Sequence, residues 1–148
     1  LAEMGSWVGM EARIYSGAHF DGEPILLAPD PALGAERSFL VVRDSNGSVV
    51  DTQEIPSGTD SYEWAGLDED GDPLPSGRYS FTLESRIGDE VMDTAPVAAY
   101  LPIIEARAED GMVVLVLPGG MLVDSATISG LRQPRTAPQP ATVPGMLY

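Results

Sequence analysis

The sequence of 148 residues contains neither cysteine nor lysine, and its only histidine is His19. Without cysteine the chain cannot form disulfides or use a thiolate. Without lysine it cannot form a Schiff base or hold phosphate with the lysine of a P-loop. A histidine-based metal cluster is excluded, and a Ser-His-Asp triad would depend on His19 in a chain that has no G-x-S-x-G motif. We therefore expect no catalytic residues, no cofactor and no metal ligands.

Positive charge is also scarce. Eight basic residues, all arginine, stand against 23 acidic residues, and the net charge at pH 7 is −15. Nucleic acids and anionic membrane surfaces attract proteins with a basic surface, so we expect neither as a partner. Most of the carboxylates fall between Gly34 and Pro96. That segment is expected to be the more solvated part of the chain.

Long apolar runs are missing as well. The sequence contains no run of about 18 apolar residues, the length needed to span a membrane. Residues 1–7 have neither the basic start nor the apolar stretch of a signal peptide. Because the chain begins at Leu1 rather than at a methionine, we interpret it as a fragment of a longer parent.

What the sequence does contain is alternation of apolar and polar residues, and no stretch has a helical period with caps. The Asn46-Gly47 step between two apolar runs predicts a β-hairpin. Residues 16–22 are expected to form a turn, and the four prolines after Gln133 predict an extended, poorly ordered tail. Extended segments are predicted at 7–15, 24–28, 39–43, 48–55, 62–64, 78–86, 91–100, 103–108, 112–117, 121–123 and 127–131. The predicted fold class is all-β.

The most informative stretch runs from Tyr62 to Phe81. It predicts a short strand ending at Trp64, an acidic turn, a Leu-Pro step and a second strand. In the second strand Tyr79, Phe81 and Leu83 share one face, and polar residues occupy the other face. Such a strand belongs in an antiparallel sheet that is wet on one side.

The same stretch resembles the immunoglobulin-like insert of the flagellar hook-capping protein, also called the basal-body rod modification protein. The resemblance covers about residues 34–96. It rests on Asp44-Ser-Asn-Gly47, Val49-Val50 and the order Trp64-x-Gly66-x-Asp68-x-x-Gly71-x-x-Leu74-Pro75-x-Gly77-x-Tyr79-x-Phe81.

The segments on either side also resemble this family. Ser6-Trp-Val-Gly9 is similar to the family's S-L-V-G start, and residues 112–131 look like its final hairpin. The resemblance implies a small Tudor-like barrel, built from residues 1–33 and 97–132, with an immunoglobulin or fibronectin-III-like sandwich inserted at 34–96 and a flexible tail at 133–148. From the boundaries near 34 and 96 we expect Trp64→Ala to unfold the insert alone. From this resemblance we expect that the chain lacks the family's N-terminal region for export and assembly.

The function implied by the resemblance is that of a non-enzymatic assembly scaffold. Such a protein is exported by the flagellar type III apparatus, self-associates into a transient ring at the rod tip, and helps hook-protein subunits polymerise. Two alternatives stay open on the residues alone. One is a protein-binding or carbohydrate-binding module of a secreted protein, and the other is an adhesion module stabilised by calcium.

Two groups of residues need an assignment. Asp68-Glu-Asp-Gly-Asp72 has carboxylates at alternate positions, but Tyr79 stands where an EF-hand needs glutamate, which favours a solvated acidic turn. Trp64, Tyr79 and Phe81 could form a sugar-binding platform, but their alternating positions favour a place in the sandwich core.

Overall fold

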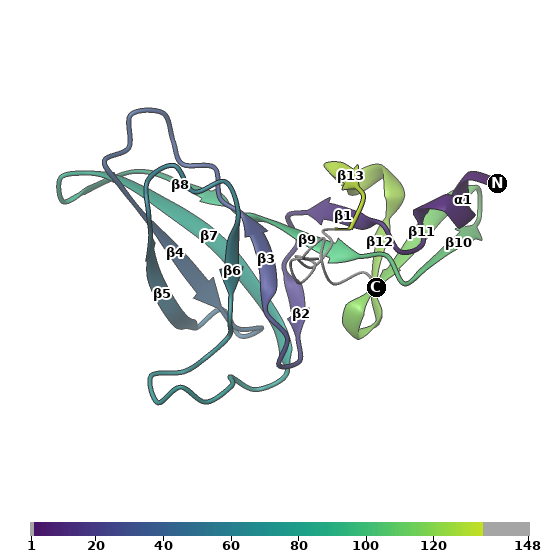
Figure 1. The fold of residues 1–148 in the computed structure, drawn as a ribbon, viewed down its shortest axis with the longest axis horizontal. Coiled ribbons are helices and arrows are strands. Elements are labelled where there is room, and N and C mark those ends of the chain that lie inside the picture. The colour runs from purple at the N-terminus through teal and green to yellow at the C-terminus, as the bar shows by residue number, and fades with distance from the viewer. Residues whose placement is uncertain (1, 135–148) are drawn as a thin grey trace, which may run out of the picture.

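The computed structural model describes residues 2–134, and it confirms the all-β class (Figure 1). Apart from one short α-helix and two single turns of 3₁₀ helix, its elements are strands. They are α1 Ala2–Trp7, β1 Glu11–Ile14, β2 Ala18–Phe20, β3 Ile25–Ala28, β4 Arg37–Arg43, β5 Val49–Ile55, β6 Tyr62–Trp64, β7 Gly77–Ile87, β8 Glu90–Pro96, β9 Ala98–Pro102, β10 Glu105–Glu109, β11 Met112–Leu117, η1 Pro118–Gly120, β12 Met121–Asp124, η2 Ser125–Thr127 and β13 Gly130–Arg132.

Strands β2 to β8 form a sandwich, which we call the sandwich lobe. One layer has the order β2-β7-β4-β5, with β8 also paired to β7, and the other layer contains β3 and β6. The predicted alternation of β7 is confirmed, because Tyr79, Phe81 and Leu83 are each at most 4% exposed. They face Trp64 of β6, which is completely buried. Burial of these side chains holds the two layers together.

The remaining elements form a second, smaller group, which we call the terminal lobe: α1, β1 and β9 to β13. Figure 1 shows it at the right of an elongated molecule. Its strand β11 lies in the middle of a β10-β11-β12 sheet, as the apolar run of residues 112–117 predicts. The two lobes are joined by more than chain crossings, because β9 pairs with β1 on one side and with β3 on the other. One sheet, β13-β1-β9-β3-β6, therefore runs through both lobes.

Two local predictions were wrong. Residues 7–15 do not form one strand, because α1 ends at Trp7 and β1 begins only at Glu11. Gly9 between them has a φ of 89°, a left-handed value outside the extended region of regular β-strands. Residues 16–22 are not merely a turn, since they contain β2, which pairs with residues 77–79 at the start of β7. The Asn46-Gly47 hairpin is confirmed by the pairing of β4 with β5.

The predicted division at residues 34 and 97 stays a prediction. Strands β2 and β3 lie before Gly34, yet they pair with β7 and β6 of the sandwich lobe. The Tudor-like character of the terminal lobe also stays a prediction, and most of the predicted tail lies outside the described residues. Among residues 2–134 no helix has the length and apolarity needed to cross a bilayer.

Candidate protein-binding surfaces

The aromatic residues of the central stretch are packing residues, as predicted. Trp64 lies with its ring centroid 5.2 Å from Phe81 and 5.4 Å from Tyr79, in tilted or edge-to-face geometry. Its indole N–H donates to Asp51 Oδ2 at 2.9 Å. Phe20, which the sequence prediction placed in a turn, completes the cluster at 5.2 Å from Trp64 and is 1% exposed. These rings are covered, so they cannot offer a sugar-stacking platform.

One carboxylate of the acidic turn binds the backbone of the turn itself. Asp68 Oδ1 accepts the N–H groups of Asp70 and Asp72, both at 2.9 Å. The N–H of Asp68 donates in turn to the carbonyl of Asp72 at 2.7 Å. The side chains of residues 68–72 are exposed, which is the arrangement of a solvated turn. Within residues 2–134 no group of three potential ligand side chains is placed to hold a metal ion.

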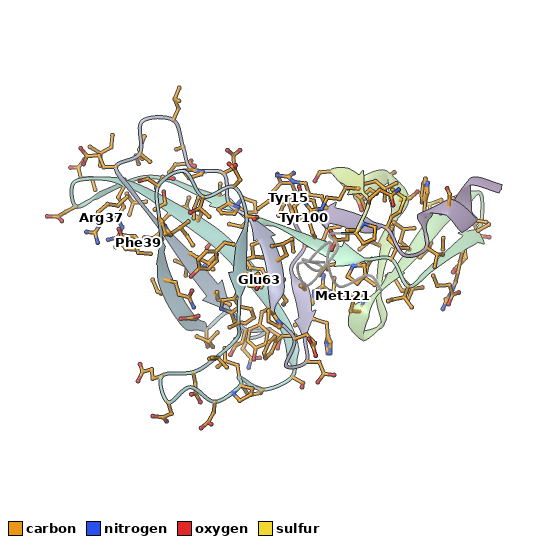
Figure 2. The ribbon with its side chains drawn as sticks, viewed as in Figure 1. Tyr15, Arg37, Phe39, Glu63, Tyr100 and Met121 are labelled. Atoms are coloured by element: carbon orange, nitrogen blue, oxygen red, sulfur yellow. The ribbon has the colours of Figure 1, made fainter. Side chains whose placement is uncertain are left out.

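His19 lies where the two lobes meet. It is half-buried on β2 and packs against Gly119, from the turn between β11 and β12. Together they line a cavity of about 660 Å³ whose other walls include Glu11, Glu63 and Tyr100. Figure 2 shows Glu63 and Tyr100 on the two sides of this junction. The cavity brings carboxylates near a histidine, but none of its lining residues is a serine, threonine or cysteine nucleophile.

A groove of about 580 Å³ follows the outer edge of β5. Five consecutive residues of that strand, 49–53, form one wall, and Leu67, Asp68 and Glu69 form the other. A side-chain face would contribute every second residue, so a run of five consecutive residues means that the groove borders the backbone edge of the strand. In the part of the chain that the structure describes, strand β5 forms a ladder only with β4, on its opposite side.

Two side-chain bonds fix β6 over the same edge of β5. Besides the Trp64 bond to Asp51, the Tyr62 hydroxyl donates to Gln53 Oε1. Burial raises the pKa of Tyr62, and the negative charge of Asp51 raises it further. Both bonds are side-chain bonds, so they hold β6 beside β5 without adding it to the ladder. No arginine lines the groove within the part of the chain that the structure describes.

The outer face of the β7-β4-β5 layer carries paired charges around one aromatic ring. Phe39 lies under two guanidinium groups, Arg37 at 5.0 Å and Arg86 at 4.4 Å from its centroid. Arg37 binds Glu54 with Nη2 to Oε1 at 2.7 Å, and Arg86 binds Glu84 at 2.8 Å. The hydrogen bond from Arg37 lowers the pKa of Glu54. Figure 2 shows Arg37 and Phe39 side by side at the far side of the sandwich lobe.

The comparisons with known proteins fit this architecture. The family model of the FlgD Ig-like domain matches residues 14–89, which is more than half of the chain and includes β2 and β3. The chain belongs to the FlgD hook-capping family. The match begins well before Gly34, in agreement with the pairing of β2 and β3 with the sandwich lobe.

Two solved FlgD structures share the fold of most of this chain. FlgD from Xanthomonas campestris, a protein whose hook capping is essential for flagellar assembly, has a TM-score of 0.71 at 18% identity and covers 90% of this chain and 98% of its own. FlgD from P. aeruginosa has a TM-score of 0.59 at 19% identity and covers 82% of this chain and 95% of its own. At this identity the likeness is one of fold. No curated protein sequence is a significant match.

Proposed function

We propose that this chain is the body of a hook cap, a non-enzymatic scaffold that promotes polymerisation of hook-protein subunits at the tip of the growing flagellar hook. The observation that carries the proposal is the match of residues 14–89 to the FlgD Ig-like domain. The common fold over 98% of the chain of FlgD from Xanthomonas campestris supports it.

The surfaces of the molecule suit a scaffold. Its one histidine is packed against Gly119, its central aromatic residues are buried, and its acidic turn uses Asp68 to hold its own backbone. Its surface instead presents strand edges, the cavity between the lobes and the groove beside β5, and both the cavity and the groove are lined by acidic residues. Proteins bind one another through such features without any chemical step.

The finer parts of the proposal concern assembly. The parent protein is exported by the flagellar type III apparatus, self-associates into a transient ring at the distal end of the rod, and leaves when the hook is complete. Its partners are hook-protein subunits and further copies of itself. A net charge of −15 keeps free copies apart in solution and favours partners with complementary charge.

Electron microscopy of basal bodies tests the proposal. Cells of the source bacterium that lack the parent gene are expected to have rods without hooks, and a plasmid copy is expected to restore the hooks. A second copy that lacks residues 14–89 serves as the control and is expected to fail. Normal hooks in the deletion strain would contradict the proposal and favour the alternative, a binding module of a secreted protein.

A further inference from the structure

We infer that the groove beside β5 binds an extended segment of a partner protein, which adds as a strand to the free edge of β5 and carries arginine or lysine beside apolar residues. The inference rests on the proposed function for the nature of the partner, an incoming protein subunit. The groove itself and the chemistry of its walls come from the structure alone.

The first step is the free edge. Among the described residues 2–134, strand β5, Val49–Ile55, pairs through its backbone with β4 only. The outer backbone groups of residues 49–53 border a groove of about 580 Å³, which leaves room for another chain. An exposed strand edge is a template for a further strand, and the backbone hydrogen bonds of the added strand supply affinity.

The second step is the shape of the groove. Its far wall is the segment Leu67–Asp68–Glu69, which the Asp68 turn and the bridge between Leu67 and Pro73 hold in place. The Trp64 bond to Asp51 anchors β6, just before this segment, to β5. A chain in the groove therefore lies between a strand edge and a fixed loop, and the loop can select its side chains.

The third step is the chemistry of the walls. Val49 and Leu67 are 54% and 44% exposed and offer apolar contacts. Three carboxylates also line the groove: that of Glu69, and those of Asp51 and Asp68, each of which has one oxygen that accepts hydrogen bonds within the chain. The nearest arginine in the sheet register is Arg43 of β4, which is paired with Val49 of β5. Its Nη1 donates to Thr82 on β7, away from the groove. The walls are complementary to a cationic segment with apolar neighbours.

The same charges argue against a second copy of this chain as the occupant. Pairing β5 with another β5 would bring two sets of Asp51, Asp68 and Glu69 together, and like charges opposite one another are unfavourable. A partner with basic side chains removes this repulsion.

The test uses the purified chain and a labelled synthetic peptide of seven alternating valine and arginine residues, as long as β5. Binding is followed by fluorescence anisotropy at low and high salt. Glu69→Arg is expected to weaken binding roughly threefold to tenfold, because it replaces an attraction by a repulsion. The matched control Glu90→Arg makes the same charge change on the exposed strand β8, outside the groove, and is expected to leave the affinity close to that of the parent chain.

Amide hydrogen exchange then separates strand addition from diffuse charge attraction. The peptide is expected to slow exchange in residues 49–53 of β5 and not in β8. A peptide with glutamate in place of arginine is expected to bind Glu69→Arg better than it binds the parent chain. Equal weakening by both variants, protection outside β5, or self-association through β5 would each overturn the inference.

Failure of this inference and failure of the proposed function give different results. If the deletion strain lacks hooks but the parent chain binds no cationic peptide, the hook-cap role stands and the groove assignment is wrong. If the deletion strain builds normal hooks but the peptide protects β5, the groove is a binding site and the hook-cap role is wrong.

Discussion

Gly66 lies directly against the ring of Phe20. A Cβ added at Gly66 would stand 2.3 Å from both Cε1 and Cζ of that ring, closer than real Cβ contacts come. Gly66 also has a φ of 72°, in the left-handed region that favours glycine. The glycine two residues after Trp64 is therefore required twice, by its backbone conformation and by the packing of the aromatic cluster.

Gly66→Ala is expected to destabilise the chain more than the equivalent change at Gly71. Gly71 has a similar φ of 83° but open space around it, so Gly71→Ala should cost about 1–2 kcal/mol of unfolding free energy from backbone strain alone. Gly66→Ala adds overpacking against Phe20, worth about 1–3 kcal/mol more. Urea unfolding of both variants measures the difference. Equal losses would mean that the Phe20 ring moves aside without cost.

The sheet that runs through both lobes bears on how the chain unfolds. Because β9 pairs with both β1 and β3, and the core side chains form one continuous cluster, we now expect a single unfolding transition rather than separate loss of the insert. Trp64→Ala should remove about 3–5 kcal/mol of unfolding free energy and lower the stability of both lobes.

The two tryptophans allow this to be measured. In Trp64→Phe the remaining Trp7 reports on the terminal lobe, and in Trp7→Phe the remaining Trp64 reports on the sandwich lobe. Within each variant the fluorescence curve in urea is compared with the circular dichroism curve. Coincident curves in both variants are expected. Separate midpoints would instead support independent lobes divided near residues 34 and 97.

The sequence predicted structure correctly where the pattern within a single strand or turn is enough to determine it. Within β7, Gly77–Ile87, apolar and polar residues alternate from Tyr79 to Leu83, so this part of its buried face could be predicted from residue type alone. The Asn46-Gly47 hairpin is also local, since Asp44 Oδ1 accepts the N–H groups of Asn46 and Ser48 within the turn. Strand β2 has only three residues, too few for a period to be recognised, and Gly17 and Gly22 beside it favour a turn.

The candidate surfaces could not be predicted in the same way. The β5 groove exists because β5 and Leu67–Asp68–Glu69, which are distant in the sequence, are brought together by the Trp64 bond to Asp51. The junction cavity depends on Gly119 meeting His19 across the two lobes. Neither contact leaves a periodic pattern in the sequence. The acidic turn was recognised, but its role as a wall of the groove follows only from the structure.

Gly119→Ala is expected to disturb the contact between the lobes. A Cβ at Gly119 would lie 2.2 Å from Cγ of His19, whereas Gly120 has nearly the same φ, 78° against 80°, and no neighbour within 4 Å. Gly119→Ala should therefore lower the urea midpoint more than Gly120→Ala does. If the clash is the cause, adding His19→Ala should recover part of the loss, and a purely additive double mutant would contradict this explanation.

Alkaline pH is expected to weaken the fold through Tyr62. Burial, with a further contribution from the charge of Asp51, raises the pKa of Tyr62 above the ordinary tyrosine value of about 10. The folded state therefore holds this proton more tightly than the unfolded state, and the stabilisation is complete below about pH 10 and is lost as pH rises through the folded pKa. Tyr79, whose pKa is raised mainly by burial, acts in the same direction. Unfolding free energies measured between about pH 8 and pH 11 should fall less steeply in Tyr62→Phe than in the parent chain, because the contribution of Tyr62 is removed. The same slope in both proteins would mean that the Tyr62 hydroxyl becomes exposed before it loses its proton.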